Sequence, residues 1–424
     1  MKTKLLIPVL LLLSVGAAAQ TSKQEFFKDV NRAGGNYYPY PGPTQKALTP
    51  APAGYEPFYI SHYGRHGSRY MTENTYYEYA IAKLDTAAQL GILTPKGAQV
   101  LEKLNIGYAD AWKRDGELSK LGARQHQEIA HRMYERFPEL LSRPMTVDAK
   151  SSTVGRCIIS MFNFCNELQG LNPALNIRMD ASKRDMRYVV GDGDIEPEEG
   201  PAAKELDAKY NALLEKAGST ITPRLMKTLF TDVPRAESFV DGFDLVLSLY
   251  NVAADLPNVP ELGISLTDVF TKEEHYLIYK VANAGLMMAC GLIPGSTPEY
   301  EMQREARDSV VSIADRVIAS GEPTLSLRFT HDAATIPLAY LMGFKEATGG
   351  TRDLENLHKT LSVDKLVPMA ANIQLVFYRK EGSDDVLVKF LMNENETSIP
   401  VKTDVAPYYH WKDVKQFWKE YPAE

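Results

Sequence analysis

Cysteine is scarce in this chain, which has three among 424 residues. Three thiols leave at least one unpaired, so a dense disulfide framework does not hold this protein together. Cys157 and Cys165 lie on one predicted helix at a separation of about 12 Å along its axis, which is too far for them to bridge each other. A bond from Cys290 to either of them stays open.

Several chemistry-bearing motifs are also missing, because the sequence contains no C-x-x-C, no H-E-x-x-H and no P-loop. Positive charge is in the minority: 47 Lys and Arg face 54 Asp and Glu, for a formal net charge of −7. This balance argues against nucleic acid as a partner, while a local basic pocket can still hold a small polyanion. We expect no metal and no cofactor.

Long apolar runs are absent except at the beginning of the chain. There, Lys2 and Lys4 precede an apolar stretch at 5–15, and three alanines follow at 17–19. This pattern is typical of a cleavable secretory signal, and the stretch is too short to span a bilayer. We therefore expect residues 1–19 to be a signal peptide, the protein to be periplasmic or secreted, and no membrane span elsewhere.

The rest of the chain divides by its patterning. Residues 20–54 are rich in proline, glycine and tyrosine, which predicts an irregular arm wrapped on the body. Strand and helix patterns at 55–180 and 321–424 flank a mostly helical stretch at 181–320. The expected fold class is α/β: a Rossmann-like, three-layer α/β/α lobe interrupted by an inserted, mainly α-helical lobe.

Individual elements follow from periodicity and from proline breaks. In the middle stretch we predict helices at 204–217, 239–254, 272–290 and 299–319. Earlier helical patterns run over 76–115 and 122–141, and late strands are expected at 324–329, 372–378 and 386–392.

The most informative motif is H-Y-G-R-H-G-S-R at residues 62–69, which directly follows an apolar, aromatic run of strand type. The guanidiniums of Arg65 and Arg69 form a fork suited to a doubly charged oxyanion. An imidazole between them is biased toward its neutral form, so His66 is a candidate nucleophile for a phosphoryl group. We expect Gly67 to leave room for a ligand close to the backbone. The alternative is a strand end with surface arginines.

A second motif, T-L-S-L-R-F-T-H-D-A, occupies residues 324–333. An apolar strand again delivers polar groups at its carboxyl end, and a helical pattern follows. His331 is a candidate donor to a phosphate oxygen, and Asp332 a candidate proton donor to a leaving alkoxide. In the alternative reading, Asp332 only caps the helix.

A third motif joins a short strand at 145–150 to a Ser-Ser-Thr capping cluster and then to a helix. Arg156 falls in the first turn of that helix, where the unpaired N–H groups already favour an anion. The alternative is a first-turn arginine that faces solvent. Since ligands of open α/β sheets bind at the carboxyl ends of strands, the three motifs are expected to converge. Three more basic residues either line a polyphosphate pocket or form a solvated cluster: Lys183, Arg184 and Arg187.

Together, R-H-G-x-R at 65–69, the helix-borne Arg156 and H-D at 331–332 resemble the histidine phosphatase superfamily, in its acid phosphatase and phytase branch. Within that branch the chain is most similar to the multiple inositol polyphosphate phosphatases. Stretches at 116–122, 367–372 and 386–394 support the likeness, which extends from about 55 to about 401.

Two departures from the family pattern concern the site. Inositol polyphosphate phosphatases usually carry H-A-E with Glu as proton donor, whereas Ala333 occupies the Glu position here and Asp332 matches the H-D of acid phosphatases. The family often has proline where this chain has Met71.

The resemblance implies hydrolysis of phosphate monoesters through a phosphohistidine on His66, with Asp332 as proton donor and no metal. The implied phosphate ligands are Arg65, Arg69, Arg156 and His331. The expected partner is a small phosphorylated molecule, an inositol polyphosphate such as phytate. A broad acid phosphatase for sugar phosphates is the alternative, and a non-catalytic module that binds phosphorylated ligands is a third. The sequence predicts no oligomeric state.

Overall fold

The computed structural model of the protein describes residues 23–322 and 324–422. The predicted signal peptide lies outside the described residues. None of the helices described there combines the length and the apolar character that crossing a membrane requires.

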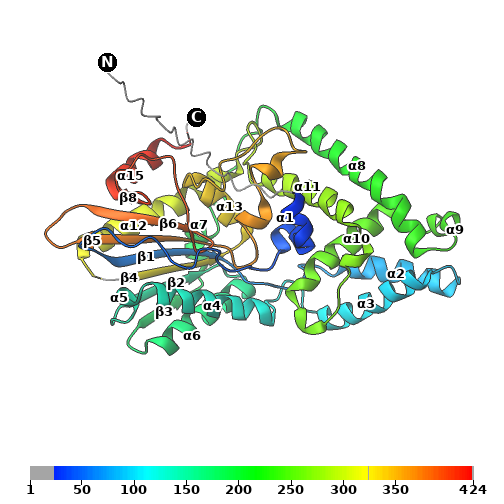
Figure 1. Ribbon diagram of the computed structural model, residues 1–424, viewed down its shortest axis with the longest axis horizontal. Coiled ribbons are helices and arrows are strands. Elements are labelled where there is room, and N and C mark those ends of the chain that lie inside the picture. Colours follow the sequence, from blue (N-terminus) through cyan, green and yellow to red (C-terminus); the bar gives the residue numbers. More distant parts are fainter. Residues whose placement is uncertain (1–22, 323, 423–424) are drawn as a thin grey trace, which may run out of the picture.

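One mixed sheet forms the centre of the described chain, in the order β3-β2-β4-β1-β5-β6-β7, with β8 paired to β6 (Figure 1). The strands are β1 (Tyr55–Arg65), β2 (Thr146–Ser151), β3 (Asn176–Asp180), β4 (Thr324–Thr330), β5 (Asn372–Lys380), β6 (Val386–Met392), β7 (Asn395–Glu396) and β8 (Tyr408–His410). The β1, β2, β3 and β4 strands pair in parallel, while β5 joins β1 antiparallel and the remaining pairs are antiparallel. The expected α/β class is confirmed, with a parallel half and an antiparallel half in the same sheet.

Helices cover both faces of this sheet (Figure 1). On one face lie α4 (Lys120–Arg136), α5 (Pro138–Leu141) and α6 (Gly155–Leu171). The other face carries α7 (Met186–Val189), α12 (Arg304–Ser320), α13 (Asp332–Leu341) and α15 (Trp411–Glu420). Alternation along β2 explains the layering, because Val147 and Ala149 are fully buried against the α4–α6 side while their neighbours face the other way.

A group of helices lies beside the sheet and contributes many residues to the larger apolar core (Figure 1). Its members are α2 (Thr75–Gln89), α3 (Pro95–Ala111), α8 (Ala203–Leu229), α9 (Val233–Glu237), α10 (Gly242–Asp255) and α11 (Lys272–Ala289). Thus α2 and α3, from the part of the chain assigned by sequence to the α/β lobe, pack against α10 and α8. Conversely, α12 from the predicted insertion contacts β1, α7 and α13.

The helix predicted for 204–217 is too short, because α8 continues through Pro223 to Leu229. A proline inside a helix removes one backbone hydrogen bond, and here the buried side chains of Ile221, Leu225 and Met226 on either side of it hold the helix in place.

The N-terminal arm is more regular than its composition suggests. It contains helix α1 (Lys23–Lys28) and the 3₁₀ helix η1 (Val30–Tyr37), so the prediction of irregular structure is wrong there. The η1 segment packs against α10, α11 and the short helix α14 (Val363–Leu366). Buried apolar neighbours, rather than local propensity, stabilise this glycine-rich stretch.

Candidate active site

The three sequence motifs meet at one edge of the sheet. In the β1–β4 register Arg65 pairs with Thr330, and in the β2–β4 register Ser151 pairs with Phe329. The residues that follow these strand ends, His66, His331 and Ser152, therefore emerge side by side. This is the convergence that parallel strand ends predict.

Two backbone segments clamp the loop that carries His66. On one side, Tyr70 N–H donates to Glu117 O at 2.9 Å and Ser119 N–H donates to Ser68 O at 2.9 Å. On the other side, residues 367–372 run along the strand end, where Arg65 N–H donates to the carbonyl of residue 371 at 2.8 Å and His66 O accepts from residue 370 at 2.9 Å. Two of the stretches that support the family likeness thus hold the loop through main-chain atoms.

Gly67 is required for a reason other than the expected one. A Cβ at this position would lie 2.4 Å from the carbonyl oxygen of Gly122, and a Cβ on Gly122 would lie 2.1 Å from Ser68 O. The expectation that Gly67 leaves space for a ligand is therefore wrong: it leaves space for the first turn of α4. The two glycines allow the loop and this helix to cross in backbone contact.

His66 is buried, and a hydrogen bond to the next residue fixes the orientation of its ring. Its Nδ1 lies 2.9 Å from Gly67 O, and since a carbonyl only accepts, Nδ1 carries the proton. Nε2 is then the atom with the free lone pair. Burial, followed by the charges of Arg65, Arg69 and Arg156, holds the pKa of His66 well below its usual range. The ring is neutral and nucleophilic at ordinary pH.

Three arginines supply positive charge around this imidazole. Arg65 is fully buried, and burial lowers its pKa to about 10 against the opposing effect of Asp332, so it stays charged at neutral pH. Burial also lowers the pKa of Arg156, near which Arg69 lies. In the described chain the buried Nε atoms of all three lack a hydrogen-bond partner. The positive charge that the three guanidiniums bring to this edge of the sheet suits an oxyanion.

His331 sits across from the nucleophile, with 5.5 Å between the two ring centroids. Arg156 Nη2 lies 3.3 Å from its Nδ1, and a guanidinium only donates, so the proton is on Nε2, which faces Ser152 Oγ at 3.1 Å. Burial and then Arg156 lower the pKa of His331 to about 4. The expected Ser-Ser-Thr cap is wrong: Val154 is the N-cap of α6, and Ser152 instead contacts His331.

Asp332 is the first residue of α13, after His331 as N-cap. Its Oδ2 accepts from Arg65 Nη2 at 2.9 Å, and its Oδ1 accepts from the backbone N–H of Ala333 at 2.9 Å. Burial alone would raise the pKa of this carboxyl, but Arg65, His66, Asn36 and Arg69 outweigh it and hold the pKa well below its ordinary value. Without substrate the group is a carboxylate.

The three further basic candidates lie on the 3₁₀ turn η2 (Lys183–Asp185) and on α7, and all are exposed. Arg187 pairs with Glu305 of α12 at 3.2 Å, and Arg184 approaches Asp180 at 3.8 Å. In the part of the chain that the structure describes, the polar contacts of these two arginines are with such neighbours and not with the phosphate-site candidates, which are Arg65, His66, Arg69, Arg156, His331 and Asp332. Their role in substrate binding stays a prediction.

Three residues at the site were missed from sequence. Asn36 of η1 donates from Nδ2 to Asp332 Oδ2 at 2.7 Å, and the ring of Tyr37 lies 4.7 Å from the Arg69 guanidinium. Asp255, at the end of α10, lies buried near Arg69. The aromatic Tyr37-Tyr38 pair after two glycines was the one local signal of a packed turn, and nothing local pointed to Asp255.

Asp255 gives a prediction for stability. Burial raises its pKa to about 7, against the opposing effects of Arg69, Met71 and Asn258. The native state therefore holds a proton that the unfolded chain releases near pH 4, so this residue's stabilising contribution falls as pH rises from about 4 to about 7. The loss is on the order of 4 kcal/mol, at about 1.4 kcal/mol per unit.

We expect Asp255→Asn to remove most of that pH dependence. Urea unfolding of wild type and variant at pH 5 and pH 8 measures it, with the difference between the two proteins isolating Asp255 from other titrating groups. A wild-type minus variant difference that does not change between these pH values would contradict the prediction.

Comparison with known proteins places this fold among phosphatases. A Bifidobacterium longum multiple inositol polyphosphate phosphatase superposes with a TM-score of 0.72 at 19% identity, over 91% of this chain and 97% of that one. The phytase from D. castellii also gives 0.72 at 16% identity, over 96% and 90%. The fold is thus that of phytases, as the motifs led us to expect.

In sequence, the chain is similar to multiple inositol polyphosphate phosphatase 1 of Gallus gallus, with 24% identity over 412 residues, 87% of this chain and 84% of that protein. No family model matches.

Proposed function

We propose that this protein hydrolyses phosphate monoesters of inositol polyphosphates through a phosphohistidine intermediate. The observation that carries the proposal is His66: it is a neutral imidazole with a free Nε2 lone pair, and the charges of three arginines act on it. An imidazole held this way can attack phosphorus while the guanidiniums offset the charge on the equatorial oxygens.

The reaction proceeds in two displacements. In the first, Nε2 of His66 forms a bond to phosphorus, the P–O bond to the alcohol breaks, and the leaving alkoxide takes a proton from Asp332. In the second, Asp332 takes a proton from water, whose oxygen bonds to phosphorus as the P–N bond breaks, releasing inorganic phosphate and free His66. Arg65, Arg69 and Arg156 hold the phosphoryl oxygens throughout, and His331 donates to one of them by turning its Nε2 proton from Ser152 to the phosphate. No metal takes part in either step.

The substrate class follows from the likeness to relatives. The Gallus gallus relative is named for multiple inositol polyphosphates, and the Bifidobacterium longum structure is a complex with inositol hexasulfate. The exposed Lys183, Arg184 and Arg187 offer positive charge for the phosphates that are not being hydrolysed.

The test compares phytate, glucose phosphates and an aryl phosphate by phosphate release from the purified protein. We expect kcat/KM to be highest for phytate. In the double variant Lys183→Gln, Arg184→Gln, the ratio of kcat/KM for phytate to that for glucose phosphates should fall about tenfold, because KM for phytate rises. Lys209→Gln, Lys216→Gln on the exposed face of α8 is the matched control.

A preference of the wild type for sugar monophosphates would replace this assignment with the broad acid phosphatase. Ala333, which stands where the inositol polyphosphate phosphatases usually have Glu, is the observation that favours this second candidate. Absence of phosphate release from every ester would leave only a module that binds phosphorylated ligands.

We also propose that the protein is exported, on the basis of the charged start, the apolar stretch and the alanines at 17–19. N-terminal sequencing of the protein recovered outside the cytoplasm should begin at Gln20. Recovery of the uncleaved chain from the cytoplasm would contradict export.

A further inference from the structure

Asn36 binds both members of the Arg65–Asp332 ion pair. Its side-chain amide donates to Asp332 Oδ2 at 2.7 Å, and its backbone carbonyl accepts from Arg65 Nη1. Arg65 Nη2 donates to the same Oδ2 at 2.9 Å. One residue of the N-terminal arm thus joins two groups that stand on different strand ends.

The two donors on Oδ2 decide where a proton can bind on Asp332. A carboxylate oxygen has two lone-pair sites, and on Oδ2 both are occupied by N–H groups, from Asn36 and Arg65. Oδ1 receives one donor, the N–H of Ala333. A proton therefore goes to Oδ1.

The backbone conformation and the packing of the neighbouring residues place Asn36 beside Asp332. Gly35 has φ 58° and ψ −116°, a conformation that glycine adopts and that other residues avoid. Gly34 packs against the backbone of α10, since a Cβ there would lie 3.4 Å from the carbonyl oxygen of Ala254. On the other side of Asn36, the carbonyl of Tyr37 accepts from Asn258 Nδ2 at 3.0 Å.

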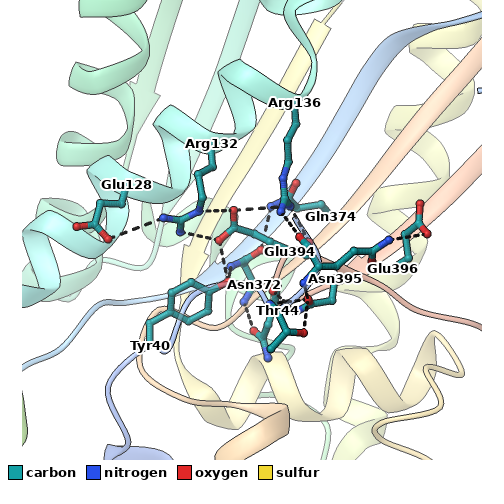
Figure 2. A network of polar contacts seen from close by, with 12 residues as sticks. Tyr40, Thr44, Glu128, Arg132, Arg136, Asn372, Gln374, Glu394, Asn395 and Glu396 are labelled. Atoms are coloured by element: carbon teal, nitrogen blue, oxygen red, sulfur yellow. Dashed lines mark hydrogen bonds and ion pairs between the residues drawn. The ribbon is translucent and has the colours of Figure 1, made fainter. Parts of the chain in front are cut away.

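The arm is anchored again a few residues later (Figure 2). Tyr40 OH donates to Glu394 Oε2 at 2.8 Å, and Arg132 of α4 binds both oxygens of the same carboxylate at 2.9 and 2.7 Å. Glu394 is only 1% exposed, in the turn between β6 and β7. Asn395 Oδ1 accepts from Thr44 N–H at 2.9 Å (Figure 2). Because both flanks are fixed, the position of Asn36 is set by the fold rather than by local flexibility.

We propose that Asn36 is a positioning residue of the site: its amide occupies Oδ2 of Asp332, so that the proton for the leaving group is carried on Oδ1. This inference rests on the proposed function. Without the amide, Asp332 keeps the bond to Arg65 but is free to present either oxygen, and transfer to the alkoxide becomes less frequent.

Among the neighbours of Asp332, Asn36 is the residue that can be substituted without removing a group that takes part in the proposed reaction. The titratable groups that interact electrostatically with this carboxyl are Arg65, His66, Arg69, Arg156, Cys157, Cys290 and His331. The charged groups and histidines among them also contact phosphate in the proposed mechanism. Asn36 is uncharged, and truncating its side chain removes one hydrogen bond to Asp332 while its backbone carbonyl still accepts from Arg65.

The experiment measures kcat from pH 3 to pH 9 for phytate and for 4-nitrophenyl phosphate, in wild type, Asn36→Ala and Asn36→Asp. Asn31→Ala, an exposed asparagine of the same η1 helix, is the matched control. We expect Asn36→Ala to lower kcat for phytate about tenfold and for the aryl ester less than about twofold, since nitrophenolate leaves without a proton.

The pH profile separates this role from a merely structural one. Loss of a donor to the carboxylate raises its pKa, so the basic limb for phytate should move up by about one pH unit in Asn36→Ala. Asn36→Asp keeps the size of the side chain and adds a negative charge, so the limb should move further in the same direction. If the melting curve shows that Asn36→Ala does not fold, the basic limb of the pH profile of Asn36→Asp tests the inference instead.

Provided that the wild-type protein hydrolyses both esters, two results would overturn the inference. One is the same behaviour of Asn36→Ala and Asn31→Ala. The other is an equal fall on both esters with an unmoved basic limb. Wild-type protein that hydrolyses neither ester would instead remove the proposed function, and the role of Asn36 with it.

Discussion

His66→Ala should lower turnover of phytate by roughly four to six orders of magnitude, the scale seen when a covalent nucleophile is removed. Among the described residues, His331 is the other histidine that ends a strand here, and neither of its nitrogens is free: Nε2 carries its proton toward Ser152, and Nδ1 accepts from Arg156. Substrate should still bind weakly to His66→Ala, because Arg65, Arg69 and Arg156 remain.

The intermediate provides an independent check on the same residue. Rapid acid-free quench of the wild type with labelled substrate should trap a phosphoryl adduct that is labile to acid and stable to base, and peptide mapping should place it on His66. His131→Ala is the control, because His131 is an exposed histidine of α4 that contacts Glu167 at 2.9 Å. An adduct on another residue, or retained turnover in His66→Ala, would contradict the assignment of His66 as the nucleophile.

The positions of His66, His331 and Arg156 could be predicted from sequence because each depends on a local pattern. Apolar strands ended just before polar groups, and parallel strands bring such ends to one edge. The family likeness added the pairing of these motifs across the chain. Periodicity served equally well for α11 and α12, whose apolar faces are regular.

What could not be predicted depends on contacts between distant residues. Asn36 and Asp332 are 296 positions apart, and no local feature of either indicates the other. The requirement for glycine at position 67 could not be explained from sequence either, because the backbone that Gly67 contacts belongs to Gly122 in α4. Composition misled for the first half of the described arm: it predicted irregular structure, whereas burial against α10 and α11 stabilises η1. Residues 38–54 form no helix or strand, as expected.

Asp332→Asn should slow phytate hydrolysis by roughly 10² to 10⁴-fold and hydrolysis of 4-nitrophenyl phosphate far less. The structure adds a condition to this expectation. Arg65 and Asn36 keep Asp332 ionised in the free protein, so we expect it to gain its proton when a phosphate dianion enters and offsets the arginine charge.

The sign of the pH dependence follows from this condition. A group with a depressed pKa is protonated at low pH, so the rate with phytate should fall as pH rises, while the rate with the aryl ester should fall less over the same range. Asp332→Asn should lose this difference between the two substrates, since an amide does not titrate. Equal losses on both esters, with the difference in pH dependence retained, would show that another carboxyl donates the proton, and Ala333 excludes the position that the inositol polyphosphate phosphatases usually employ.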